Sequence, residues 1–203
     1  MQPDLDNIHK YLETHHLGIN KYRVTVGEGV SQCFGIVSKR SAPPDLSRQS
    51  WLHAELHHLL MEYANKHVMI PFTSIQVNCN YICAPHKDHG NIGQSFIIGF
   101  GDYTGGELCI DSNENAYDIR SGLLFNGSEK LHWTKPWTGT RYSLVFSTLK
   151  SRFPAIEMKN ITDYEAVFVD DKWKIKYNDN GTVKYLYGKN GLPHPLKGRP
   201  KKT

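Results

Sequence analysis

Between residues 73 and 148 the chain is divided into many short segments of alternating polarity, which limits the possible folds more than any other feature. The first segment, TSIQVNCNYI, has one face made of Ile75, Val77, Cys79 and Tyr81 and another made of Gln76, Asn78 and Asn80. Gly, Asn, Asp and Pro separate further strands predicted at 95–101, 106–111, 116–119, 122–126, 131–134 and 140–148. Short strands at this density indicate antiparallel sheets rather than a parallel α/β fold.

The residues before this region are predicted to form helices and a pair of strands. Apolar residues at helical spacing occur at Leu5, Ile8 and Leu12, with Asp4 or Asp6 to cap the helix and Gly18 to end it. Residues 22–40 suggest two short strands around a glycine turn. The clearest helix is residues 51–66, with a stripe of Leu52, Leu56, Leu59, Leu60 and Tyr63.

Helices followed by many short strands predict an α+β protein whose core is a double-stranded β-helix, or jelly roll, with the helices packed on one side. We expect residues 1–70 to be a supporting region, 71–150 the catalytic core and 151–203 a basic C-terminal extension. In that extension, alternating residues around NDNG predict a β-hairpin. The last residues, GLPHPLKGRPKKT, are expected to be flexible.

Charge is distributed unevenly along the chain. Residues 172–203 contain nine Lys or Arg and one acidic residue, whereas the net charge of the whole chain is only +4. The tail is therefore expected to contact a polyanion. Its KGRPKKT segment resembles an AT-hook core that lies in the DNA minor groove. A single short match slightly favours the alternative, a solvated basic terminus with no specific partner.

The remaining composition describes an ordinary globular domain, with 39% hydrophobic and 22% charged residues. No apolar run approaches the roughly 18–20 residues of a membrane helix, and the polar N-terminus lacks a signal-peptide core. We therefore expect an intracellular protein of the nucleus or cytoplasm without membrane contact. The four cysteines, expected to be reduced, do not form the pairs of a zinc site: Cys33, Cys79, Cys83 and Cys109.

A candidate metal site follows the first predicted strand, in CAPHKDHGNIGQSF. His86 and Asp88 are two residues apart and share a face of an extended chain, and His132 arrives from a distant strand. Two histidines and one carboxylate form the facial triad that binds Fe(II) and leaves coordination positions open. The alternative is a polar turn, because a His-x-Asp pair arises easily by chance in a chain with eleven histidines. Other histidines, including His53 and His57, are expected on solvated helix faces.

Arg141 follows His132 by nine residues, in the strand GTRYSLVF. It shares a strand face with Ser143 and Val145, and a charged side chain on the inner face of an apolar strand needs a partner. The distal carboxylate of 2-oxoglutarate, bound by the planar guanidinium, would be such a partner, with Ser143 as a further donor. The spacing therefore predicts an Fe(II)/2-oxoglutarate oxygenase.

From about Ser74 to Thr148 the chain resembles the Fe(II)/2-oxoglutarate-dependent dioxygenase superfamily, and within it most closely the TET/JBP class of nucleic-acid base hydroxylases. The resemblance lies in HKDHGN, GDYTGGEL, the His132 strand and GTRYSLVF. It implies iron binding by His86, Asp88 and His132, binding of 2-oxoglutarate by Arg141 and Ser143, and dioxygen as the oxidant. The chain lacks the cysteine-rich domain and the long insertion of the animal enzymes, which indicates a minimal version of viral or microbial type.

The class resemblance further implies a substrate, the methyl group of 5-methylcytosine or thymine in DNA. Asn91 matches the position of an asparagine that contacts the flipped-out base, and an amide can both donate to and accept from a pyrimidine edge. Asn91 is equally compatible with a turn cap. Gln76, Asn78 and Asn80 are expected to line the barrel mouth, with Asn78 and Asn80 near the co-substrate.

Three alternatives remain open from the sequence. The same barrel could hydroxylate a protein side chain, as a prolyl hydroxylase does, or a free nucleotide or small metabolite. A metal-free jelly-roll module that binds DNA through the basic tail is the third. The presence of all three ligand positions and the arginine favours an enzyme.

Overall fold

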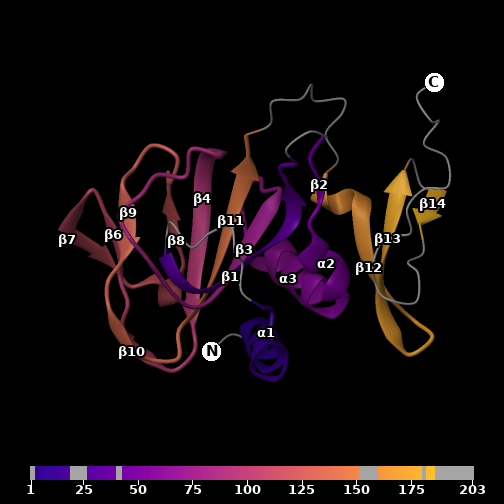
Figure 1. The fold of residues 1–203 in the computed structure, drawn as a ribbon, viewed down its shortest axis with the longest axis horizontal. Coiled ribbons are helices and arrows are strands. Elements are labelled where there is room, and N and C mark those ends of the chain that lie inside the picture. The colour runs from indigo at the N-terminus through magenta and orange to yellow at the C-terminus, as the bar shows by residue number, and fades with distance from the viewer. Residues whose placement is uncertain (1–2, 19–26, 40–42, 151–159, 180–181, 186–203) are drawn as a thin grey trace.

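The computed structural model describes residues 3–18, 27–39, 43–150, 160–179 and 182–185 (Figure 1). The three α-helices in these ranges all precede Ser74, and strands follow, as predicted for an α+β chain. In order they are α1 (Pro3–Thr14), β1 (Gly27–Val37), β2 (Asp45–Leu46), α2 (Arg48–Leu52), α3 (Ala54–His67), β3 (Ser74–Cys83), β4 (Asn91–Phe100), β5 (Tyr103–Gly105), β6 (Leu108–Ile110), β7 (Ser112–Tyr117), η1 (Ile119–Ser121), β8 (Leu123–Phe125), β9 (His132–Thr134), β10 (Trp137–Gly139), β11 (Tyr142–Leu149), η3 (Ile161–Asp163), β12 (Tyr164–Val169), β13 (Lys172–Asp179) and β14 (Thr182–Tyr185).

A six-stranded antiparallel sheet, in the order β2-β1-β3-β11-β4-β8, forms the centre of the molecule. Strand polarity alternates as the sequence predicts. Ile75 and Val77 of β3, with Leu144 and Phe146 of β11, belong to the main hydrophobic core that the helices share. The intervening residues of these two strands face the other side of the sheet. The α+β class is therefore confirmed, and helices cover one face of the sheet (Figure 1).

A smaller antiparallel sheet, β7-β6-β9, packs toward the opposite face of the central sheet. A second apolar cluster connects the two sheets, because Leu108 of β6 packs with Ile97 of β4 and with Ile119 and Phe125. Strands β5 and β10 form a separate two-stranded ribbon. The space between the two sheets holds the site described below.

The predicted helix over 51–66 is instead two helices, α2 and α3, that meet at His53. The backbone of His53 is non-helical, with φ −122° and ψ 58°, so the two helices do not share one stripe. Leu52 is consequently 42% exposed, although it was predicted to be buried. No helix in the described ranges is both long and apolar enough to cross a membrane.

The glycine turn predicted within residues 22–40 is wrong for the part that the structure describes. Gly27 and Gly29 lie inside the single strand β1, where a side chain would collide with the backbone of β3 at Ile82 and Asn80. Gly29 has a φ of +108° and sits at a register shift between Glu28 and Val30. These glycines permit close strand approach and a β-bulge instead of a turn.

The other predicted strands correspond to β4, β6, β8, β9 and β11 with shifted ends. The strand predicted at 116–119 is wrong in its second half, because Asp118 caps the short helix η1 by accepting a hydrogen bond from the Arg120 amide. Ribbon strands β5 and β10 were not predicted. Each has only three residues, among glycines and prolines that suggest loops.

The C-terminal sheet, β12-β13-β14, packs on α3 on the side away from the central sheet (Figure 1). The pairing of β13 with β14 confirms the hairpin predicted around NDNG. The stacked rings of His58 and Trp173, with centroids 4.5 Å apart, are part of this packing. The tail that carries KGRPKKT lies outside the described residues.

His57 of α3 departs from the prediction of a solvated face. His57 is completely buried, and neither ring nitrogen has a hydrogen-bond partner among the described residues. Burial lowers its pKa to about 4. The helix α3 packs against α1 as well as against β12 and β13, so little of its surface is left for an exposed histidine.

Acid should therefore destabilise the fold through His57. The unfolded chain takes up a proton near pH 6.5 and the folded chain only near pH 4, so stability is lost as the pH falls between these values. The expected loss is about 2 kcal/mol at pH 5. Urea unfolding of His57→Leu should lack this component, whereas the exposed control His16→Leu should keep it. Equal pH dependence of the wild type and His57→Leu would contradict the assignment.

Candidate functional site

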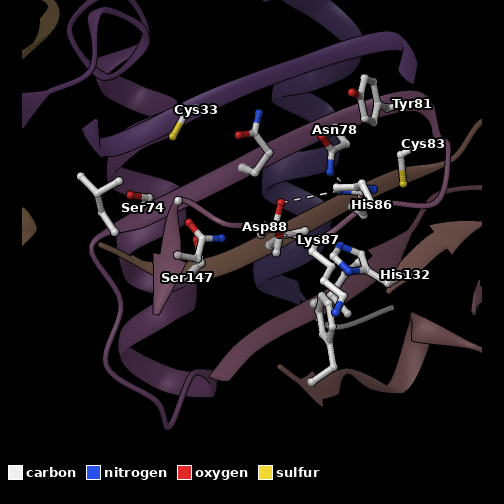
Figure 2. A pocket seen from close by; sticks show the side chains of 18 of the residues that line it. Cys33, Ser74, Asn78, Tyr81, Cys83, His86, Lys87, Asp88, His132 and Ser147 are labelled. Atoms are coloured by element: carbon white, nitrogen blue, oxygen red, sulfur yellow. Dashed lines mark hydrogen bonds and ion pairs between the residues drawn. The ribbon is translucent and has the colours of Figure 1, made fainter. Parts of the chain in front are cut away.

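The three predicted metal ligands converge between the two sheets. His86 and Asp88 lie in the connection between β3 and β4, and His132 begins β9. His86 and His132 exchange two backbone hydrogen bonds of 3.0 Å, which fix the two segments side by side. One ligand atom from each of the three side chains lies within 4.8 Å of the others. Figure 2 shows the three labelled side chains gathered at one place in the pocket.

Each histidine presents the same ring nitrogen to the centre of this group. Nδ1 of His86 lies 2.8 Å from the Ala84 carbonyl, and Nδ1 of His132 lies 3.0 Å from the Lys130 carbonyl. A carbonyl only accepts, so each Nδ1 carries a proton and each Nε2 is left to bind a cation. Those Nε2 atoms lie 3.6 Å and 3.7 Å from the two Asp88 carboxylate oxygens.

The electrostatics also suit a cation. Burial by itself lowers the pKa of His86, but its contacts with Asp88, with the Cys83 thiol and with the Ala84 carbonyl raise it to about 10. Burial lowers the pKa of His132. One proton is thus held beside the Asp88 carboxylate, and a divalent cation at the two Nε2 atoms would replace it. Donor set and orientation both fit Fe(II).

Gly127, which the sequence analysis did not single out, makes room for this arrangement. Its carbonyl accepts a 2.8 Å hydrogen bond from the Asp88 amide. A Cβ atom at Gly127 would lie 3.2 Å from Asp88 Oδ2 and 3.3 Å from the His132 ring. The Phe125 ring contacts His132 edge-on at a centroid distance of 5.1 Å. The segment FNG therefore packs directly behind the ligands.

The triad opens onto a cavity of about 460 Å³ between the sheets. The cavity is lined by eight of the residues that the sequence predicted for the site: His86, Asp88, His132, Arg141, Ser143, Gln76, Asn78 and Asn91. Figure 2 shows Asp88, His86 and His132 together, with Asn78 beside them and Ser74 and Ser147 farther along the cavity. Its apolar wall includes Ile97, Leu108 and Val145.

Arg141 lines the cavity and is 2% exposed. Its Nε donates to the Gly106 carbonyl at 3.1 Å, while Nη2 has no hydrogen-bond partner among the described residues. Burial lowers its pKa, although a guanidinium stays charged at neutral pH. A buried cation with an unused donor that borders a cavity fits an anionic ligand there.

A row of polar side chains leads to the neighbouring Ser143. Gln76 Nε2 donates to the Ser31 hydroxyl at 2.9 Å, and Ser31 donates to Asn78 Oδ1 at 2.7 Å. Asn78 Nδ2 in turn donates to Ser143 Oγ at 3.1 Å. Because Ser143 accepts this hydrogen bond, its own proton is left for an acceptor, and the residue lines the cavity.

Asn80 does not lie where the alternation of β3 predicts. It has a φ of +46° and is exposed, and its side chain accepts a 2.8 Å hydrogen bond from the Arg141 amide. The left-handed residue reverses the alternation, so Tyr81 and Cys83 face the cavity in its place. Asn80 is not among the residues that line the cavity.

The cysteines do not form a second metal site in the described part of the chain, where the only His/Cys/Asp/Glu cluster is the triad. All four are free thiols. Cys83 lines the cavity, with Sγ 3.3 Å from the Thr134 hydroxyl. Thr134 and Gly127 were not predicted from the sequence, because their positions depend on long-range pairing. Tyr81 was predicted on the apolar face of its strand, but it lines the cavity.

No protein-family model and no curated protein sequence matches the chain. It is similar to the solved structure "NgTET1 in complex with 5mC DNA" at 16% identity and a TM-score of 0.48, over 71% of this chain and 68% of that chain. A Pseudomonas putida prolyl-4-hydroxylase matches at 12% identity and 0.41, over 72% of this chain and 84% of its own. A Burkholderia pseudomallei oxidoreductase of the 2OG-Fe(II) oxygenase family matches at 14% identity and 0.43, over 74% and 94%. Because these TM-scores lie below 0.5, the function has to be inferred from the site residues themselves.

Proposed function

We propose that this protein is an Fe(II)- and 2-oxoglutarate-dependent dioxygenase. One observation supports this most strongly: a His-Asp-His triad and a buried arginine with an unused donor border the same cavity. The triad alone would suit several divalent metals. Arg141 adds the cationic group that a dicarboxylate bound at the metal would need.

Different side chains would bind the metal and the co-substrate. His86, Asp88 and His132 would hold Fe(II), which supplies the chemistry that couples 2-oxoglutarate and dioxygen to substrate oxidation. Arg141 binds and orients the distal carboxylate, and the Ser143 hydroxyl donates to it. Apolar residues such as Ile97 line the same cavity and lower its polarity, which would strengthen these charge interactions.

We also infer that the central sheet and the β7-β6-β9 sheet are the two halves of a double-stranded β-helix. Support comes from the apolar cluster between the sheets and from the His86–His132 bridge that joins β9 to the end of β3. In such a barrel the cavity opens at one end, where the triad lies.

For the substrate, we propose the methyl group of 5-methylcytosine or thymine in DNA, flipped out of the duplex. Asn91 lines the cavity at the start of β4, three residues after Asp88. Its backbone amide donates to the Asp88 carbonyl at 2.9 Å, so its own position depends on the metal-binding segment. An amide near the triad suits a pyrimidine edge, which both donates and accepts.

Succinate formation tests the proposal directly. The protein should release succinate from 2-oxoglutarate only with Fe(II), and a chelator should stop the reaction. A panel of methylated DNA, peptides and free nucleotides then identifies the substrate by its stimulation of turnover. No succinate with any of these substrates would contradict the enzyme assignment, whereas stimulation by peptide alone would contradict the DNA substrate.

Asn91→Ala should reduce hydroxylation of the base by about tenfold or more, because a donor and an acceptor are both lost. Succinate formation without DNA should persist, since the metal and co-substrate residues are unchanged. Mass spectrometry of the DNA product measures base hydroxylation, and succinate release measures turnover without DNA. Asn113→Ala, on the exposed strand β7, is the matched control. Equal loss of both activities would mean that Asn91 only supports the fold.

A further inference from the structure

Arg141 is the largest fully buried side chain of the described chain, yet it has no acidic partner there. No carboxylate among the described residues lies within 4.0 Å of its guanidinium. A buried cation without a counter-charge is costly, so something other than an ion pair must hold it in place.

Two aromatic residues lie beside the guanidinium, and one of them, Tyr103, also interacts with it through its side-chain hydroxyl. The guanidinium carbon lies 5.6 Å from the Tyr103 ring centroid and 5.4 Å from that of Trp137. Aromatic faces attract a cation without neutralising it. Both rings come from the β5–β10 ribbon, whose pairs are Trp137 with Gly105 and Gly139 with Tyr103. We call these two rings the aromatic cage.

The backbone around the cage fits the arginine closely. Gly106 has a φ of +74°, and a Cβ there would lie 2.8 Å from Arg141 Cδ and 2.9 Å from Nε. Its carbonyl is the acceptor for Nε. On the opposite strand, Asn80 exchanges hydrogen bonds of 2.8 Å with the Arg141 backbone in both directions. The segment YTGG therefore supplies a ring, a space and an acceptor for one side chain.

A second arginine supports the cage from outside. Arg120 lies 4.1 Å from the Tyr103 ring centroid and donates to the Tyr103 carbonyl at 2.5 Å. Asp118 pairs with Arg120 at 2.8 Å. Asp118 thus balances the charge of Arg120, while the charge of Arg141 is not balanced by a carboxylate of the described residues and faces the cavity.

We propose that Tyr103 and Trp137 are positioning residues that aim an uncompensated Arg141 guanidinium at the co-substrate. This inference rests on the proposed function in one respect: the anion that Arg141 receives is the distal carboxylate of 2-oxoglutarate. The cage fixes the guanidinium before the anion arrives, which lowers the entropy cost of binding. It also explains why GDYTGGEL contributes to the site without touching the metal.

The first experiment needs no co-substrate. NMR of the full chain with Zn(II) as a diamagnetic metal should show one slowly exchanging arginine Nε–H, assigned to Arg141 among seven arginines by Arg141→Lys. Tyr103→Leu and Trp137→Leu should each broaden it or speed its exchange with water at least tenfold. Tyr103→Phe and the exposed control Tyr117→Leu should preserve it. An unchanged signal in both leucine variants that remain folded would overturn the proposal.

The second experiment measures co-substrate use. Tyr103→Leu or Trp137→Leu should raise the KM for 2-oxoglutarate about tenfold with little change in kcat, and calorimetric binding without dioxygen should weaken equally. Tyr103→Phe should restore both. A fall in kcat at unchanged KM would overturn the positioning role. If the wild type binds no 2-oxoglutarate, the proposed function fails, and the NMR result still decides whether the cage holds Arg141.

Discussion

Asp88→Ala is expected to abolish both Fe(II) binding and succinate formation. The carboxylate lies 3.6 Å and 3.7 Å from the two Nε2 atoms, so its loss leaves two neutral imidazoles with no anionic ligand. His86→Ala and His132→Ala should have the same effect. Loss of a residue that only hydrogen-bonds to a metal ligand typically lowers metal affinity about 10–100-fold. Loss of a ligand itself should lower the affinity further.

The fold of these variants should persist, because the ligands border the cavity and contribute nothing to the main apolar core. His16→Ala is the control: an exposed histidine that belongs neither to the cluster nor to the cavity lining. Equilibrium dialysis with Fe(II) without dioxygen, circular dichroism and succinate release measure the three properties. Iron binding and succinate production by the triple variant at the wild-type level would refute the metal assignment.

The sequence indicated His86 and Asp88 because their spacing is a local feature, whereas His132 comes close to them only through the pairing of distant segments. His86 and Asp88 are adjacent on one face of a short segment, and Arg141 is conspicuous as a charge on an apolar strand. The alternation of β3 and β11 likewise depends only on neighbouring residues, and it placed Gln76 and Ser143 on the cavity side. Period-two patterns carry this information without knowledge of the pairing.

The sequence could not predict features that depend on distant partners. Asn80 adopts a left-handed conformation within a β-bulge, and no periodicity signals a single reversed residue. His57 is buried in a helix that packs against β12 and β13, more than one hundred residues later in the chain. Tyr103 and Trp137 reach Arg141 only through the pairing of two three-residue strands. In each case tertiary contacts override a correct local pattern.

Arg141→Lys should raise the requirement for 2-oxoglutarate sharply. Lysine keeps the charge but loses the planar fork and the Nε hydrogen bond to Gly106. Loss of a charge-assisted contact costs about 1.5–3 kcal/mol, which corresponds to roughly 10–150-fold in affinity. Arg141→Met, which also removes the charge, should bind the co-substrate still more weakly. Calorimetric titration without dioxygen provides both values.

In the metal-loaded protein without co-substrate, replacing Arg141 should leave thermal stability unchanged or increase it. There the buried guanidinium has an unused Nη2 donor and no counter-charge, so Arg141→Met should unfold at a temperature equal to or above that of the wild type. Added 2-oxoglutarate should then stabilise only the wild type, since a ligand that binds the folded state stabilises it by RT ln(1 + L/Kd), where L is the free ligand concentration. Thermal unfolding of the wild type and of Arg141→Met, each with and without 2-oxoglutarate, measures these changes in unfolding temperature. Equal stabilisation of Arg141→Met by 2-oxoglutarate would show that another residue binds the distal carboxylate.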